Sequence, residues 1–119
     1  MKTLVNALVI LTIFTGSALA DTCRYDTDWG ILIMEIDHIS GEVTGEYSYQ
    51  NGHIQGHLDN ISIHGQWFQD NGEGILYFKM TDWGFSGKWA FTDDTDWQGK
   101  WNGSLIDCAN PETSLAPEE

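Results

Sequence analysis

Hydrophobic and polar residues alternate along most of the chain, and turn-forming residues recur at short intervals between the alternating runs. Alternation puts successive side chains on opposite faces of an extended strand, so that one face is hydrophobic and the other polar. No stretch beyond the first twenty residues shows the apolar period of a helix. The pattern therefore predicts an all-β fold, an antiparallel meander of seven or eight strands.

The turn signals predict which residues of neighbouring strands face each other. Asn51-Gly52 is a dipeptide typical of a two-residue hairpin turn. Asp59-Asn60 and Asn71-Gly72 mark the next two turns, and Thr81–Gly84 marks a four-residue turn. The predicted facing pairs are Tyr49 with Ile54, Leu58 with Ile61, Trp67 with Leu76, Phe78 with Gly87 and, across the loop Thr92–Asp96, Trp89 with Gly99.

Glycines recur inside these predicted strands, and in the predicted register they face large residues. A glycine normally weakens a strand, but opposite a ring it leaves room for that ring and lets the sheet coil sharply. We therefore place Trp67, Trp89 and Trp101 in the core. Because the other face is polar and no helix is predicted to cover the hydrophobic one, the sheet must curve onto itself. We expect a small closed barrel or a strongly curved sheet.

The first twenty residues differ from the rest of the chain. Lys2 precedes an apolar run over residues 4–14, and small residues close the segment at Ala18-Leu19-Ala20. This is the arrangement of a secretory signal peptide cleaved before Asp21, which predicts a secreted or periplasmic protein. The predicted organisation is a signal peptide over 1–20, a single β domain over 21–109 and a disordered acidic tail over 110–119.

Acidic residues dominate the predicted mature chain. Without Lys2, four basic residues stand against 18 acidic ones, a net charge of −14. Such a surface repels nucleic acid and anionic membranes, so we expect no nucleic-acid partner and no membrane insertion. Glycans, metal ions and extracellular proteins remain as partners, and the oligomeric state is left open.

The two cysteines, Cys23 and Cys108, are predicted to form a disulfide, as an even pair in an exported domain does. Their Cα atoms must then lie within about 7 Å of each other. In one arrangement Asn102-Gly103 is a turn, and Ser104–Cys108 returns as a short eighth strand. In the other, Asp21–Asp28 runs along the barrel to reach Cys108. We favour the first arrangement.

Two stretches resemble known families. GKWAFTDDTDWQGKWNGSL resembles the Gly-aromatic β-hairpins of MORN repeats, where G-x-W or G-x-Y alternates with glycine turns. WGILIMEIDHISGEVTGEYSY resembles the opening strands of the avidin–streptavidin family, whose barrels carry a similar G-x-x-T-G-x-Y hairpin. Tyr47 matches a ligand-contacting position of that family, but Tyr49 stands where the family has a serine. The resemblances imply an antiparallel meander, or a barrel with one open mouth, and no particular ligand.

Histidine and acidic residues provide two candidate metal sites. Glu46 faces His57 in the predicted register, and three imidazoles share its face, since His64 lies diagonal to both His53 and His57. Such a set suits zinc or copper. Calcium binds six to eight oxygens, and its candidate ligands are the acids expected at one end of the barrel: Asp26, Asp28, Asp93, Asp94 and Asp96. The competing interpretation of both sets is a solvated polar surface.

Exposed aromatic residues at turns suggest a binding surface. Trp29 and Trp83 fit best, because both fall at turns or strand starts. A sugar ring could stack on either indole, although Trp83 could instead plug the barrel end. The other predicted ligand-binding residues are Asp28, Asp82 and Asn102 beside them, and Tyr77 with Phe68 in a second outward patch.

The tripeptide Thr-Asp-Trp occurs three times, at 27–29, 81–83 and 95–97. Threonine and aspartate favour turns, so we interpret the repeat as turn and strand-start chemistry and not as a repeated site. The three tryptophans are expected in different surroundings. Trp29 begins the first strand, Trp83 lies inside a turn and Trp97 opens a core strand.

No Ser-His-Asp arrangement, phosphate loop or H-E-x-x-H motif suggests an enzyme. A barrel filled with tryptophan also leaves little room for a substrate cleft. The leading hypothesis is an exported, small, non-catalytic binding module with a glycan as ligand. The alternatives are a structural or protein-interaction element of the cell exterior, using the outer face around Phe68, Ile75 and Tyr77, and a zinc- or copper-binding periplasmic protein.

Overall fold

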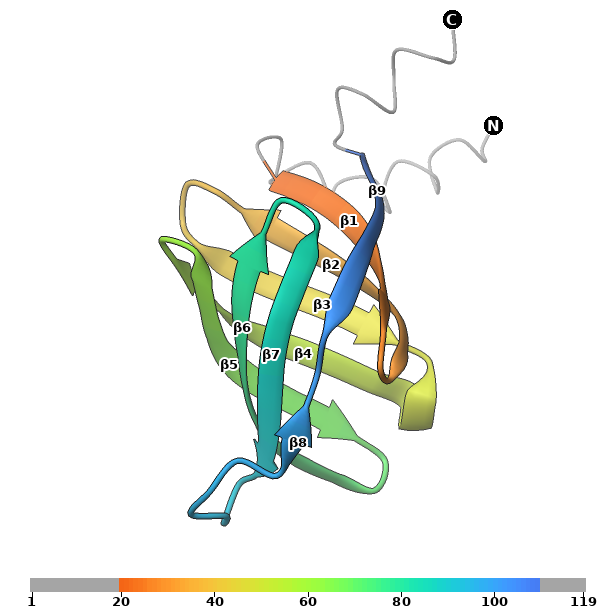
Figure 1. Cartoon of the computed structure of the whole chain (residues 1–119), viewed down its shortest axis with the longest axis vertical. Coiled ribbons are helices and arrows are strands. Elements are labelled where there is room, and N and C mark those ends of the chain that lie inside the picture. Colours follow the sequence, from red (N-terminus) through yellow and green to blue (C-terminus); the bar gives the residue numbers. More distant parts are fainter. Residues whose placement is uncertain (1–19, 110–119) are drawn as a thin grey trace, which may run out of the picture.

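The computed structural model describes residues 20–109, which form nine strands and one short 3-10 helix (Figure 1). The strands are β1 (Ala20–Thr27), β2 (Gly30–Asp37), β3 (Glu42–Tyr47), β4 (Gly52–Asp59), β5 (Ser62–Gln69), β6 (Gly72–Thr81), β7 (Gly84–Phe91), β8 (Gly99–Lys100) and β9 (Gly103–Ala109), and the helix η1 is Tyr49–Asn51. The predicted signal peptide, apart from Ala20, and the predicted tail lie outside the described residues.

The strands form one antiparallel sheet that closes on itself. Neighbours follow chain order from β1 to β7, and β9 then lies between β1 and β7. Eight strands complete the ring, and the two-residue β8 is an additional strand beside β7. The predicted all-β antiparallel meander is confirmed, and of its two expected forms the closed barrel is the one observed.

The inside of the barrel is filled by hydrophobic side chains, as in other barrels of eight strands. Phe78 stacks on Phe85 with ring centroids 4.0 Å apart, and it meets Trp101 edge-on at 5.3 Å. Trp67 and Trp101 are buried as predicted, whereas Trp89 is only partly buried. Within residues 20–109 no polar or charged residue is fully buried. The core therefore depends mainly on packing, with hydrogen bonds from the polar tips of its aromatic side chains.

The predicted register is correct for the later hairpins and wrong for the first three. The confirmed facing pairs are Phe78 with Gly87 and Trp89 with Gly99. The observed pairs that replace the predicted ones are Tyr47 with Gly52, Leu58 with Ile63 and Trp67 with Gly74. Relative to the predicted register, the pairing of β3 with β4 is shifted by four residues. The pairings of β4 with β5 and of β5 with β6 are each shifted by two.

These displacements come from the turns. The β3–β4 connection is the η1 turn, with Gln50 and Asn51 both at positive φ, instead of a two-residue turn at Asn51-Gly52. The β4–β5 turn uses Asn60-Ile61, with Asn60 at φ 63°. Side chains alternate with a period of two, so an even displacement leaves each residue on its predicted face. The predicted core survives for this reason although its facing pairs do not.

The predicted disulfide is present, but the favoured course of the last strand is wrong. Cys23 faces Cys108 in the β1–β9 pair, with the two Cα atoms 4.0 Å apart. β8 and β9 both run antiparallel to β7, so the chain continues through Asn102-Gly103 without turning back. The alternative arrangement is the correct one, because β1 runs along the barrel and brings Cys23 to Cys108. The disulfide fits an oxidising, extracytoplasmic setting.

Two of the three Thr-Asp-Trp copies form the same hairpin turn. At Thr27–Gly30 and Thr81–Gly84, Asp and Trp occupy the two loop positions and Gly follows at φ 99° and 146°. The threonine hydroxyl accepts a hydrogen bond from the tryptophan backbone N–H and donates one to the glycine carbonyl oxygen. The repeat is therefore a Thr-Asp-Trp-Gly turn, as its chemistry predicted.

The third copy, at residues 95–97, forms no hairpin. Gln98 follows it in place of glycine, and a residue with a side chain rarely adopts the positive φ that the other two turns need. Trp97 is half-exposed, and the Lys88 ammonium lies 5.0 Å from its ring centroid. The predicted core position of Trp97 is wrong.

The two turns differ by one hydrogen bond, since the Trp101 indole N–H also donates to Thr27 Oγ1 at 3.2 Å. We expect Thr27→Val to lower the free energy of unfolding by about 2 kcal/mol and Thr81→Val by about 1 kcal/mol. Urea denaturation of the two variants measures both losses. Equal losses would contradict a stabilising role for the Trp101 bond.

Candidate functional site

An open groove lies between the two Thr-Asp-Trp-Gly turns. β9 runs between the turns, with Gly103 facing Thr27 on one side and Phe85 on the other. The groove has a volume of about 550 Å³, and we call it the Trp83 groove. The lining residues with side chains suited to a ligand are Trp83, Asp26, Asp28, Ser86, Asn102 and Ser104.

Two glycines form the floor of the Trp83 groove. A Cβ atom on Gly84 would lie 2.0 Å from the carbonyl oxygen of Gly103, and one on Gly103 would lie 2.5 Å from the Phe85 ring. Neither position has space for a side chain. Both positions therefore accept only glycine, and they contribute backbone atoms to the floor. The Phe85 ring that Gly103 accommodates belongs to the buried core.

Hydrogen bonds fix one wall of the Trp83 groove. The Asn102 backbone N–H donates to Asp28 Oδ2 at 2.8 Å, and the Gly87 N–H donates to Asn102 Oδ1 at 3.2 Å. These bonds join the β1–β2 turn to the break between β8 and β9. The Asp26 carboxylate and the hydroxyls of Ser86 and Ser104 lie exposed on the same groove. The arrangement offers fixed and free polar groups beside an exposed indole.

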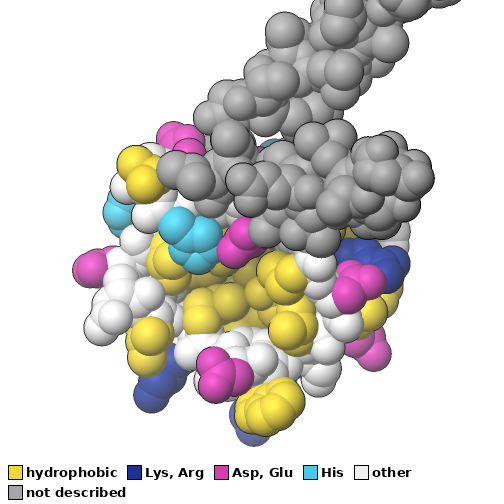
Figure 2. Space-filling view, turned by 90° about the horizontal axis from the view of Figure 1, so that it is seen from above, with side chains coloured by type: hydrophobic (Ala, Val, Ile, Leu, Met, Phe, Trp, Pro, Cys, Tyr) yellow, Lys and Arg dark blue, Asp and Glu magenta, His cyan; other side chains and the backbone are white. Residues whose placement is uncertain are grey.

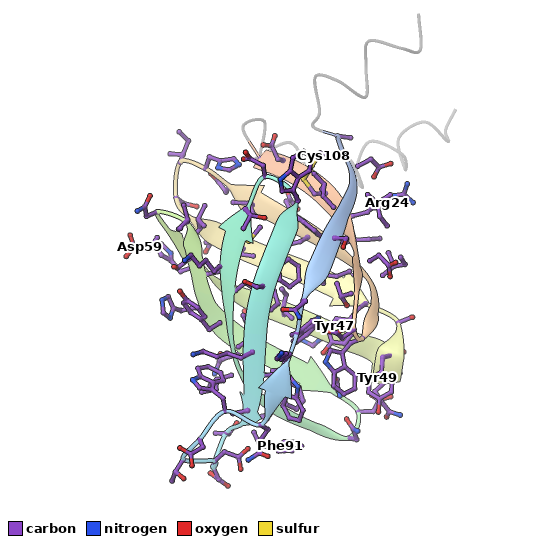
Figure 3. The ribbon with its side chains drawn as sticks, in the orientation of Figure 1. Arg24, Tyr47, Tyr49, Asp59, Phe91 and Cys108 are labelled. Atoms are coloured by element: carbon purple, nitrogen blue, oxygen red, sulfur yellow. A yellow bond between two sulfur atoms is a disulfide. The ribbon has the colours of Figure 1, made fainter. Side chains whose placement is uncertain are left out.

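A second site lies where the β1–β2 turn, η1 and the end of β7 meet. It is a partly enclosed cavity of about 200 Å³, which we call the aromatic cup. Its lining residues are Trp29, Tyr49, Trp67, Trp89, Phe91 and Trp101, with Gln69 and Asn71 as the polar members. Figure 3 shows Tyr49 and Phe91 toward the lower end of the barrel, far from Cys108.

The rings of the aromatic cup support one another edge to face. Trp89 meets Trp29 at 5.8 Å, Trp67 at 5.9 Å and Phe91 at 5.3 Å between ring centroids, all at nearly right angles. Such pairs stabilise beyond the area that they bury. The Trp67 indole N–H donates to the Ala90 carbonyl oxygen at 3.2 Å, which fixes that ring. The cup is thus built from mutually held rings and not from loose side chains.

The polar members of the aromatic cup are bonded to protein groups. The Tyr47 hydroxyl donates to Gln69 Oε1 at 2.7 Å, and Gln69 Nε2 donates to Asn71 Oδ1 at 2.8 Å. Burial raises the pKa of Tyr47 well above its usual value, and the phenol is a hydrogen-bond donor to Gln69. These two bonds engage both the oxygen and the nitrogen of the Gln69 amide.

The structure separates the predicted ligand-binding residues. Trp83 shares a groove with Asp28, whereas Trp29 lines the aromatic cup. Asp82 is exposed in the turn beside Trp83. Tyr77 lies elsewhere, on β6, near the Ser62 hydroxyl and the Lys88 ammonium. Trp83 is 82% exposed, which rules out its alternative interpretation as a plug of the barrel end.

The predicted histidine site does not form. Glu46 faces His53 instead of His57, and His57 faces His64 directly. His53 stacks on Phe68 and His64 tilts against Tyr77, so the imidazoles contact aromatic rings. Within the described part of the chain, no three His, Cys, Asp or Glu side chains come close enough together to hold a metal ion. This also corrects the expected calcium site, where Asp28 and Asp94 are engaged by backbone N–H groups.

The end of the barrel farthest from Phe91 presents a different surface. Figure 2 views the molecule from above and shows hydrophobic side chains gathered at the centre of this end, with acidic and histidine side chains around them. Both described sites, the Trp83 groove and the aromatic cup, combine aromatic rings with defined walls, and they are therefore the stronger candidates.

The chain matches no family model, no curated protein and no solved structure. The barrel architecture agrees with what the two resemblances imply, but membership of neither family is supported. In the range 20–109 there is no helix of the length and apolar character needed to cross a membrane. Any functional assignment must therefore come from the sites themselves.

Proposed function

We propose that this protein is an exported, non-catalytic binding module that holds a glycan in the Trp83 groove. The observation that carries the proposal is the 82% exposure of the Trp83 indole beside the groove. Leaving so large an apolar surface in water is unfavourable, and exposed aromatic surface commonly marks an interaction site. A sugar ring would cover the indole face with its C–H groups.

The surroundings of Trp83 support a polyhydroxylated ligand. The wall offers the carboxylates of Asp26 and Asp28 and the hydroxyls of Ser86 and Ser104. Carboxylates accept hydrogen bonds, and hydroxyls both donate and accept them. The bare glycine floor lets a ring approach the backbone closely. The volume of about 550 Å³ suits one or a few sugar units.

Trp83→Ala is expected to weaken glycan binding about fivefold or more, because a ring stacked on an aromatic side chain contributes about 1–3 kcal/mol. A glycan array finds the ligand, and isothermal titration of the best oligosaccharide compares the variant with the wild type. Because the indole is exposed, the melting temperature should hardly change.

Ile39→Ala provides the matched control, since Ile39 is 75% exposed but lies in the β2–β3 turn, away from the groove. This variant should bind as the wild type does. An array without a hit, or equal binding by Trp83→Ala and wild type, would refute the proposal. The protein-interaction alternative around Phe68, Ile75 and Tyr77 stays a prediction.

A further inference from the structure

The aromatic cup calls for a different ligand from the Trp83 groove. Six of its eight lining residues are aromatic, and no basic residue is among them. Its volume of about 200 Å³ is below the range typical of sites for drug-sized molecules. It can therefore receive a head group of a ligand, and the chemistry of that group must match a cage of rings.

Rings far outnumber polar groups in the aromatic cup. The indole N–H groups of Trp67 and Trp101 and one N–H of Gln69 already donate to protein oxygens. The donors left among the lining residues are the Tyr49 hydroxyl, the Asn71 amide and the indole N–H groups of Trp29 and Trp89. A sugar ring enclosed there would need a partner for each of its hydroxyls, and each buried unpaired polar group costs about 1–3 kcal/mol. A methylated ammonium needs no hydrogen bond. Its charge is instead attracted to the negative faces of the surrounding rings.

Two carboxylates lie near residues of the aromatic cup. Asp70 lies between the lining residues Gln69 and Asn71, and its carboxylate accepts a hydrogen bond from Asn51 Nδ2 at 2.6 Å. Asp94 Oδ2 accepts one from the backbone N–H of Phe91, another lining residue, at 2.7 Å. Neither carboxylate lines the cavity, but Asp70 adjoins two lining residues in sequence and Asp94 is hydrogen-bonded to a third. They favour a cationic ligand over an anionic one at ordinary ionic strength.

We propose that the aromatic cup binds the quaternary ammonium group of a small ligand. The site is distinct from the Trp83 groove, and the proposal goes beyond glycan binding. Rings from five separate parts of the fold form the cage, namely the β1–β2 turn, η1, β5, β7 and the link between β8 and β9. The nearby carboxylates of Asp70 and Asp94 favour a cation, and the rings hold its methyl groups.

Isothermal titration of the full-length mature protein with choline tests the proposal, with dimethylbutanol, the neutral carbon isostere of choline, as the matched ligand. Choline should bind at least about tenfold more tightly than the isostere, since the two differ only in charge at the buried group. High salt should weaken choline binding and leave the isostere unaffected.

Variants of half-exposed rings locate the site without threatening the core. Tyr49→Leu and Phe91→Leu should each weaken choline binding about fivefold or more, because an aliphatic side chain keeps the apolar contact but has no ring quadrupole. Trp83→Ala should leave choline binding unchanged, which separates this proposal from glycan binding. Near-ultraviolet circular dichroism confirms that each variant keeps the native packing.

Three results would overturn the proposal: no binding at millimolar choline, equal affinity for choline and its neutral isostere, or choline binding that survives in both ring variants. The first excludes the ligand class. The second shows an apolar pocket that is indifferent to charge, and the third places the binding elsewhere on the molecule.

Discussion

Removal of the Cys23–Cys108 disulfide is expected to lower the free energy of unfolding by about 4 kcal/mol. The two cysteines are 85 residues apart in sequence, so the bond restricts nearly the whole unfolded chain. It also joins β1 to β9, the first and last strands of the barrel, at the seam where the sheet closes. For a domain of this size the loss corresponds to a melting temperature roughly 20 °C lower.

The measurement is chemical denaturation of the Cys23→Ser, Cys108→Ser double variant beside the wild type with and without reductant. Asp107→Asn is a suitable control, because it removes the exposed Arg24–Asp107 ion pair on the same two strands and leaves the disulfide intact. An exposed pair of this kind contributes little, so the control should stay close to the wild type. A double variant as stable as the wild type would show that strand pairing alone secures the seam.

Gly74→Ala is expected to lower the free energy of unfolding by about 3 kcal/mol. Gly74 faces Trp67, and a Cβ atom there would lie 1.9 Å from the Ala90 carbonyl oxygen and 2.7 Å from the Trp67 ring. In an unstrained strand, alanine would be the better residue by roughly 0.5–1 kcal/mol. At this position the clash should outweigh that gain, because backbone and a buried ring cannot both move away.

Urea denaturation checks the Gly74 prediction, with Glu73→Ala as the control on the neighbouring, solvent-facing position of β6. The clash should also disturb the Trp67 indole and its hydrogen bond to Ala90, which intrinsic fluorescence detects. If Gly74→Ala proved more stable than the wild type, the explanation that glycines make room for rings would be wrong.

The aromatic cup shows what the sequence pattern left undetected. Tyr49 and Phe91 were not predicted to belong to a site, although both stand at the end of a strand or in the adjoining turn. Trp67 and Trp89 were predicted only as core. A signal was present, since large aromatic residues recur at several strand ends. It could not be interpreted, because which strand ends meet depends on the stagger of the strands around the barrel.

Local chemistry did determine several features from the sequence alone. Alternation assigned most residues to the correct face, the even cysteine pair predicted the disulfide, and the Thr-Asp-Trp chemistry predicted turns. The faces and the turns depend on residues that are close in sequence, or on a pattern whose period matches the strand itself, and the disulfide followed from the number of cysteines. They tolerate register errors of two or four residues, since an even slip preserves the face.

Only the tertiary structure decided how the barrel closes and where its sites lie. The sequence pattern did not distinguish a turn at Asn102-Gly103 from a chain that continues past these residues. In the structure the chain continues, and the Asn102 backbone N–H donates a hydrogen bond to Asp28. That bond joins residues 74 positions apart in the chain. The closure of the barrel through β9 also places Trp83 beside the glycine floor of the Trp83 groove and makes Trp29 a lining residue of the aromatic cup. Contacts over such separations depend on the geometry of the whole sheet, so no local pattern encodes them.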